Sequence, residues 1–392
     1  LNMAIMYGIV QFLIQGSSNV YKFLGAQFSN LYDWRTSLLL LNINFLLCIL
    51  LTFLFLRKDV ALGKEPFKFD FKGWILLILF FLPILFLSAE GQNREWFNDS
   101  KVSLAFAIIL AVTGAYLFYA SKAEAPIINL KVYRYRNVAF GSLFFFLIGL
   151  VNGTGSVIMG YMAGLLGFDD LYIARTHLYI LAGTVFSIPI CTYMMYRRVY
   201  LNIAAIFGFL AFTIYHLLMY FRFYPGIGEA DFVLPFVIKG IGIGFLYLLS
   251  ALYISENVPK QFSTSRMMSG IISRIVLATI LGGAVLSTAI SNTTTMHKTG
   301  ISQQLTTGNT IASEKHKHTK NYYLSQGLEP AAADKMADNP LQSEMKTPAT
   351  LLAYKDIYLA MAVISFLPII ILLFSRIGRR PLQSIQVEPL PM

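Results

Sequence analysis

The sequence predicts an all-α, polytopic membrane protein with about ten transmembrane helices. Hydrophobic amino acids make up 56% of the 392 residues and charged ones only 13%, about half the share of roughly 25% in soluble proteins. Apolar runs recur along the whole chain, and the run 74–89 contains no charge. A helix of roughly 20 such residues crosses a bilayer, and helices and closed barrels alone satisfy their backbone groups in lipid.

The apolar runs define ten expected spans: 3–29, 36–56, 72–90, 102–121, 137–165, 174–196, 199–221, 231–255, 264–290 and 352–375. The third and fourth are apolar all round, with Trp and Tyr near their ends, which is typical of lipid-facing helices. We therefore expect them at the periphery. The spans 231–255 and 264–290 instead each contain a deep cation and several glycines, which is typical of helices that pack closely.

The basic residues of the short loops gather mainly on one side of the predicted membrane. The positive-inside rule then places the loops 57–71 and 122–136, the tail 377–392 and the C-terminus in the cytoplasm. The net charge of +11 is explained by this orientation, and we predict no nucleic-acid partner. The polar segment 291–351 becomes a hydrated extracytoplasmic loop, with some helix near 321–338. Its Lys-His-Lys-His run at 315–318 is expected to be solvated, so no metal site is predicted.

Four polar residues at membrane depth are candidates for lining a substrate path: Lys239, Arg274, Asn152 and Thr154. A charge inside the bilayer is tolerated when it faces water or a partner. For Lys239 the alternative is that its side chain reaches to the outer interface. For Arg274 the alternative is a structural role in which its side chain pairs with backbone carbonyls. The stretch 152–155, Asn-Gly-Thr-Gly, predicts either a cavity-lining kink or close helix packing.

No predicted span has a carboxylate at its centre, and none has a His–acid pair at helical spacing. An enzyme acting at a membrane face needs such a constellation. We therefore predict that the protein is not an enzyme and has no cofactor.

Several short motifs occur in one order along the chain: Asp33-Trp34-Arg35 with Asn42-Ile43-Asn44, Phe69-Asp70-Phe71-Lys72-Gly73, Ala125–Leu130 with Tyr133–Asn137, Gly240–Gly244 preceded by Lys239, Ser269-Gly270 with Arg274, and Ala353-Tyr354-Lys355-Asp356. Their shared order resembles the major facilitator superfamily, specifically the fourteen-helix drug:proton antiporters similar to the EmrB/QacA multidrug exporters. This resemblance assigns the ten spans to helices five to fourteen. We therefore expect the chain to be a piece that lacks four N-terminal helices.

The resemblance implies a domain scheme. Residues 1–56 would be a remnant of the N-terminal bundle, 72–121 two extra peripheral helices, and 137–376 a C-terminal six-helix bundle. Five glycines would serve close helix packing: Gly25, Gly240, Gly242, Gly244 and Gly270.

The resemblance also implies proton-coupled efflux of hydrophobic or amphipathic compounds by alternating access, from a multi-pass position in the inner membrane. Its partners would be a small-molecule substrate, protons, the lipid bilayer and a periplasmic adaptor protein. This chain alone would be inactive in transport. The alternative is a degenerate transporter-like sensor or scaffold, because Tyr21 and Lys22 stand where the family's helix-five motif has Gly-Pro.

Overall fold

A computed structural model of the chain describes residues 3–55, 70–306 and 310–374. The described residues are overwhelmingly helical, so the predicted all-α class is confirmed. The helices are α1 (Met3–Leu31), α2 (Trp34–Phe55), α3 (Phe71–Glu90), α4 (Ser100–Lys122), α5 (Arg136–Asn152), α6 (Gly155–Met159), α7 (Asp170–Tyr196), α8 (Leu201–Arg222), α9 (Ala230–Ser255), α10 (Ser263–Ile271), α11 (Gly282–Thr306), α12 (Thr310–Ser325) and α13 (Pro330–Phe374). The tail 377–392 and most of the loop 57–71 lie outside the described residues.

Tighter or wider helical turns join some of these helices: η1 (Trp96–Asn98), η2 (Leu130–Arg134), η3 (Gly160–Leu165), η4 (Lys260–Phe262) and η5 (Ile272–Leu281). Within the described ranges, nine helical segments are long and apolar enough to span a membrane. The protein is thus a multi-pass membrane protein. The tenth predicted span, α1, is a continuous helix that is not among these nine. Its sequence includes polar residues such as Gln15, Asn19 and Lys22, which lower its hydropathy.

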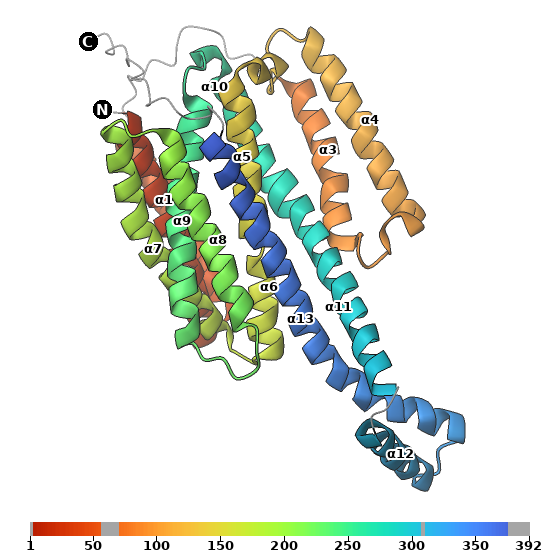
Figure 1. Cartoon of the computed structure of the whole chain (residues 1–392). Helices are drawn as coiled ribbons and strands as arrows, with labels where there is room; N and C mark the ends of the chain where they lie inside the picture. The colour runs from red at the N-terminus through yellow and green to blue at the C-terminus, as the bar shows by residue number, and fades with distance from the viewer. Residues whose placement is uncertain (1–2, 56–69, 307–309, 375–392) are drawn as a thin grey trace, which may run out of the picture.

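The bundle is organised around α9, which is more deeply buried than the other membrane-spanning helices of the described chain. It packs against α7 on one side and α8 on another, and it also contacts α5 and α1. Figure 1 shows α1, α7, α8 and α9 running side by side, with the long helices α11 and α13 crossing beyond them. The core therefore sits where α9 meets its neighbours, and the polar residues of α9 are held at membrane depth.

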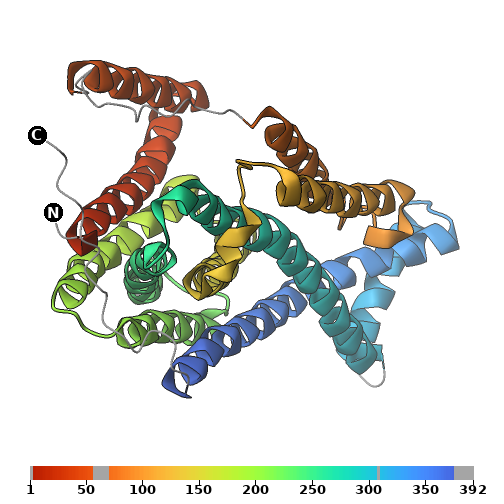
Figure 2. The ribbon, with the colours of Figure 1, turned by 90° about the horizontal axis from the view of Figure 1, so that it is seen from above.

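The pair α3 and α4 lies at the edge of the bundle (Figure 2). The two helices pack on each other and reach the remaining helices chiefly through η5 and α11. The indole nitrogen of Trp96, in the turn between them, donates to Thr288 Oγ1 of α11 at 2.9 Å. Helix α2 packs on α1 and leaves most of its apolar side chains exposed. Such surfaces are stable only against lipid or further helices.

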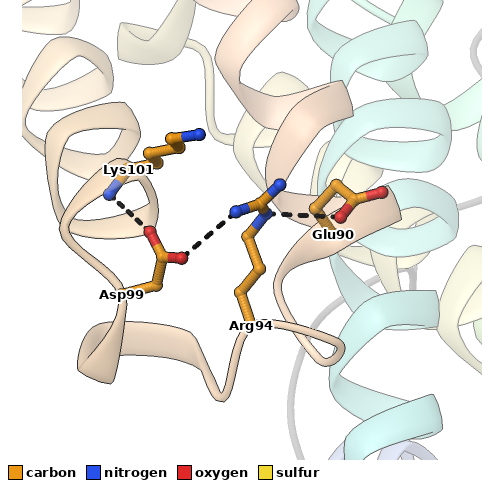
Figure 3. Close-up of polar contacts among 4 residues, drawn as sticks. All are labelled: Glu90, Arg94, Asp99 and Lys101. Atoms are coloured by element: carbon orange, nitrogen blue, oxygen red, sulfur yellow. Dashed lines mark hydrogen bonds and ion pairs between the residues drawn. The ribbon is translucent and has the colours of Figure 1, made fainter.

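The turn between α3 and α4 is held by a small charged cluster (Figure 3). Arg94 pairs with Glu90 at 3.3 Å and with Asp99 at 3.2 Å. Asp99 also caps α4, because its carboxylate accepts the backbone N–H of Lys101 at 2.6 Å. That hydrogen bond, and then the Arg94 side chain, lower the pKa of Asp99 below its ordinary value of 3.8. Arg94 and Asp99 lie between the two spanning segments, and their contacts join the end of α3 to the start of α4.

We expect the pH to control this cap in a defined direction. Folding lowers the pKa of Asp99 below its ordinary value of 3.8. The stabilisation by the Asp99 carboxylate is therefore complete at pH values above that ordinary pKa and is lost as the pH falls through the lowered pKa. Asp99→Ala should then speed hydrogen exchange in the first turn of α4 at neutral pH. The unsubstituted protein should exchange as fast as Asp99→Ala only in strong acid, after each rate is corrected for the intrinsic effect of pH on exchange. Ser121→Ala, at the other end of α4, is the control, and equal exchange in all three proteins at neutral pH would contradict the capping role.

The segment 291–351 differs from the expected hydrated loop. Helix α11 continues to Thr306, α12 follows, and α13 begins at Pro330, well before the predicted span. These helices extend beyond the rest of the bundle (Figure 1). Contacts join these helices to one another: Lys320 Nζ of α12 lies 2.5 Å from Asp334 of α13, and His297 Nε2 of α11 lies 2.7 Å from Asp356 of α13. Its polar composition does favour water, but Ala, Lys, Glu and Gln are also strong helix formers.

Candidate functional site

A polar cavity of about 630 Å³ lies at membrane depth between α1 and the other half of the bundle. Its walls come from α1, α5, α6, α7, α9, η5 and α11, with one residue from α3. The elements that meet here are far apart in the sequence. The cavity therefore exists only in the assembled bundle, at the junction between α1 and the helices that follow α4.

Lys239 lies in the wall of this cavity, nearly ten residues into α9. The side chain is only 3% exposed. Its ammonium lies 5.1 Å from the ring centre of Tyr215 and 6.0 Å from that of Phe236. Within the described residues Lys239 forms no ion pair. Cation–π contacts of this kind offset part of the cost of desolvating a charge, so the ammonium is held at the cavity without a neutralising partner from the described part of the chain.

Three basic residues line the cavity: Lys22, His177 and Lys239. Among the described lining residues there is no aspartate or glutamate. The Nδ1 atom of His177 is buried without a hydrogen-bond partner in the described chain. A low-dielectric pocket strengthens the field of the charges in it. The cavity therefore favours electron-rich groups over cations.

The stretch 152–155 breaks the helix, as the kink hypothesis predicts. Helix α5 ends at Asn152, and α6 begins at Gly155. The N–H of Gly153 is shared between the carbonyls of Gly149 and Leu150. This interruption brings Asn152, Gly153 and Gly155 to the cavity wall. Irregular backbone at membrane depth is tolerated where it lines such a cavity.

Thr154 does not line the cavity, because it is fully buried on the other side of the break. Its hydroxyl lies 3.3 Å from Nε2 of His216, and its carbonyl accepts the hydroxyl of Tyr358 at 3.0 Å. His216 Nδ1 faces the carbonyl of Phe212 at 2.7 Å and so carries the hydrogen. Tyr358 also contacts Tyr215, whose ring lies under the Lys239 ammonium. A buried polar network thus links the break before α6 to α8 and α13, and it reaches Lys239 through the ring of Tyr215.

Arg274 is partly buried in η5, a wide helical segment. Its guanidinium carbon lies 5.2 Å from the ring centre of Tyr247, and Tyr247 itself lines the cavity. The ring of Tyr247 therefore lies between Arg274 and the cavity, and the assignment of Arg274 to the substrate path stays a prediction.

The glycines of α9 and α10 lie where helices touch. A Cβ on Gly240 would meet the carbonyl of Ile180 at 2.2 Å, and one on Gly244 would meet Ser187 Oγ at 2.0 Å. Gly242 faces α8, and Gly270 faces the ring of Phe145. Gly25 is different, since a Cβ there would meet no atom within 4 Å in the described chain. A packing role for Gly25 stays a prediction.

Sequence reasoning missed the contribution of α1 to the cavity. Gln15, Ser18, Asn19 and Lys22 all line it. Their spacing of i, i+3, i+4 and i+7 puts them on one face of a helix, and that pattern is visible in the sequence. The sequence marks Lys22 as a departure from a motif and as one of the polar residues expected to face the absent helices, whereas the structure places it in the wall of the same cavity as Lys239.

Outside the cavity, the His-rich run predicted to be solvated lies in α12. His316 Nε2 is 3.9 Å from Asp334, which also pairs with Lys320. In the described ranges no group of three or more His, Cys, Asp or Glu side chains could hold a metal ion. The cavity is thus the candidate site.

Fold and cavity together define a multi-pass helical membrane protein with a polar chamber at membrane depth. No family model matches the chain. The chain is 20% identical over 313 residues to the probable multidrug resistance protein EmrY of Escherichia coli. This match covers 77% of the present chain and 59% of EmrY. It is 22% identical over 340 residues to the colistin resistance protein EmrB of Acinetobacter baumannii, covering 83% and 62% of the two chains.

A shorter match relates it to the quinolone resistance protein NorB of Staphylococcus aureus, 28% identical over 164 residues, or 40% of this chain and 33% of NorB. The family resemblance predicted from the motifs is confirmed at low identity: the chain is a relative of the EmrB-type multidrug exporters of the major facilitator superfamily. It spans about three-fifths of the length of EmrY and EmrB.

Proposed function

We propose that this chain forms part of a proton-coupled exporter of hydrophobic or amphipathic compounds. The observation that carries the proposal is the cavity of about 630 Å³ with Lys239 buried in its wall. An ionisable residue inside a membrane is costly and marks a substrate or ion pathway by default. A chamber of this volume is within the roughly 300–1,000 Å³ range of ligand sites. The names of the relatives, which are drug-resistance and export proteins, support the same class of function.

The proposed mechanism is alternating access. The cavity lies where α1 meets α7 and α9, so a rocking of α1 against the bundle would open it to one side and then the other. The described cavity wall lacks a carboxylate. We therefore propose that the carboxylate that couples transport to protons lies outside this cavity wall.

We propose an inner-membrane location with the C-terminus in the cytoplasm, because basic residues dominate the loops on that side. The helices α11, α12 and α13 would then extend on the opposite side (Figure 1). An adaptor protein that docks on these extended helices is a further proposed partner.

Transport by the complete protein in proteoliposomes tests the proposal. An imposed pH gradient should drive uptake of an amphipathic dye into inside-acidic vesicles and should move protons in the opposite direction. An ionophore that collapses the gradient should stop both. Dye movement that ignores the gradient would contradict proton coupling. Absence of dye and proton movement, in protein shown to be folded, would favour the sensor or scaffold alternative.

A further inference from the structure

A second hollow lies between α1 and α7, separate from the polar cavity. It has a volume of about 490 Å³, and its walls include Ile5, Ile9 and Phe12 of α1 and Ile188 and Pro189 of α7. None of its lining residues belongs to the polar cavity. We call it the lateral groove.

The walls of the lateral groove offer almost no polar group to a ligand. The hydroxyl of Thr192 is already used, because it donates to the carbonyl of Ile188 at 2.8 Å. Drug-sized ligands are oriented by a few well-placed polar groups, and here such groups are scarce. An apolar chain needs no such groups.

The groove adjoins an exposed face of α7, to which its lining residues Tyr193 and Tyr196 belong. Phe186, Ile190 and Tyr193 are exposed large side chains of this membrane-spanning helix. Apolar side chains that are exposed at membrane depth are stable against lipid acyl chains.

One end of the groove is basic. Tyr193 and Tyr196 line it there, and the guanidinium of Arg197 lies 5.8 Å from the ring centre of Tyr193. Arg198 follows directly and is exposed. Within the described residues neither arginine forms an ion pair. Tyr at the interface with Arg beside it is the pattern that binds headgroups.

We infer that the lateral groove binds one anionic phospholipid. Its acyl chain lies along the apolar walls between α1 and α7, and its phosphate is held by Arg197 and Arg198. At Gly8 a Cβ would meet Thr192 Oγ1 at 2.2 Å, so α1 and α7 touch along the floor of the groove. The inference does not depend on what the polar cavity transports.

Native mass spectrometry of the complete protein tests this site. The protein is equilibrated with equal amounts of palmitoyl-oleoyl phosphatidylglycerol and phosphatidylcholine, and the first retained lipid is identified. We expect a roughly fivefold preference for phosphatidylglycerol, because basic residues near the surface attract anionic headgroups. The double variant Arg197→Gln/Arg198→Gln should retain the two lipids about equally. Ile9→Trp, which fills the groove, should lose the first retained lipid altogether.

The matched control is Lys131→Gln/Arg134→Gln, which removes two exposed basic residues of η2 and should keep the preference. Equal retention of the two lipids by the parent would overturn the inference. So would an unchanged preference in the Arg197→Gln/Arg198→Gln variant, or a retained first lipid in a folded Ile9→Trp protein. Thermal unfolding of each variant in detergent shows whether it is folded. The lipid-binding result does not depend on the transport assay, so either proposal can be refuted without the other.

Discussion

Gly240→Leu is expected to abolish folded protein in the membrane. A Cβ on Gly240 would lie 2.2 Å from the carbonyl of Ile180 and 3.0 Å from Cα of Gly183, and both atoms belong to the backbone of α7. A backbone cannot rotate away as a side chain can. Overpacking a core costs about 1–3 kcal/mol when side chains adjust, so here we expect at least about 3 kcal/mol.

The measurement for Gly240→Leu is the amount of monodisperse protein extracted in mild detergent, together with its thermal unfolding midpoint. Gly114→Leu is the control, because a Cβ on Gly114 of the peripheral helix α4 would meet no atom within 4 Å. Both variants add the same side chain to a membrane-spanning helix. If Gly240→Leu gave as much folded protein as Gly114→Leu, the direct contact of α7 with α9 would be refuted.

Lys239→Met in the complete protein should reduce efflux about tenfold or more, which corresponds to about 1.4 kcal/mol, at an unchanged membrane level. The substitution keeps the length of the side chain but removes the buried charge that faces the cavity. Insertion should not suffer, because a charge at membrane depth opposes insertion. Lys239→Arg should retain part of the activity, because the charge remains.

Efflux of each variant is measured as the initial rate of dye loss from loaded cells, divided by the membrane level of the protein. Lys122→Met serves as the control, since Lys122 lies at the exposed end of α4 over the ring of Phe118. Undiminished efflux by Lys239→Met at equal membrane level would return Lys239 to the alternative in which it only reaches toward the interface.

The sequence alone determined the class of protein and the main polar landmarks. Apolar runs of spanning length are a local property, so the all-α membrane fold could be predicted without any tertiary contact. The break at 152–155 was also predictable as one of two alternatives, because two glycines beside two polar residues weaken a helix at membrane depth. Lys239 could also be identified from the sequence, because a single charge within a long apolar run is a local feature.

The tertiary structure decided which of these residues face one another. Hydropathy shows that a segment is buried in lipid or protein, but the face turned to a neighbour depends on contacts between distant segments. Thus Lys22 joins Lys239 in one cavity, and Thr154 turns away from Asn152 although only two positions separate them. The described parts of the segment 291–351 are largely helical where polarity suggested a loop, because polarity indicates a preference for water and not a backbone conformation. The groove between α1 and α7 likewise arises only when two helices from distant parts of the chain meet.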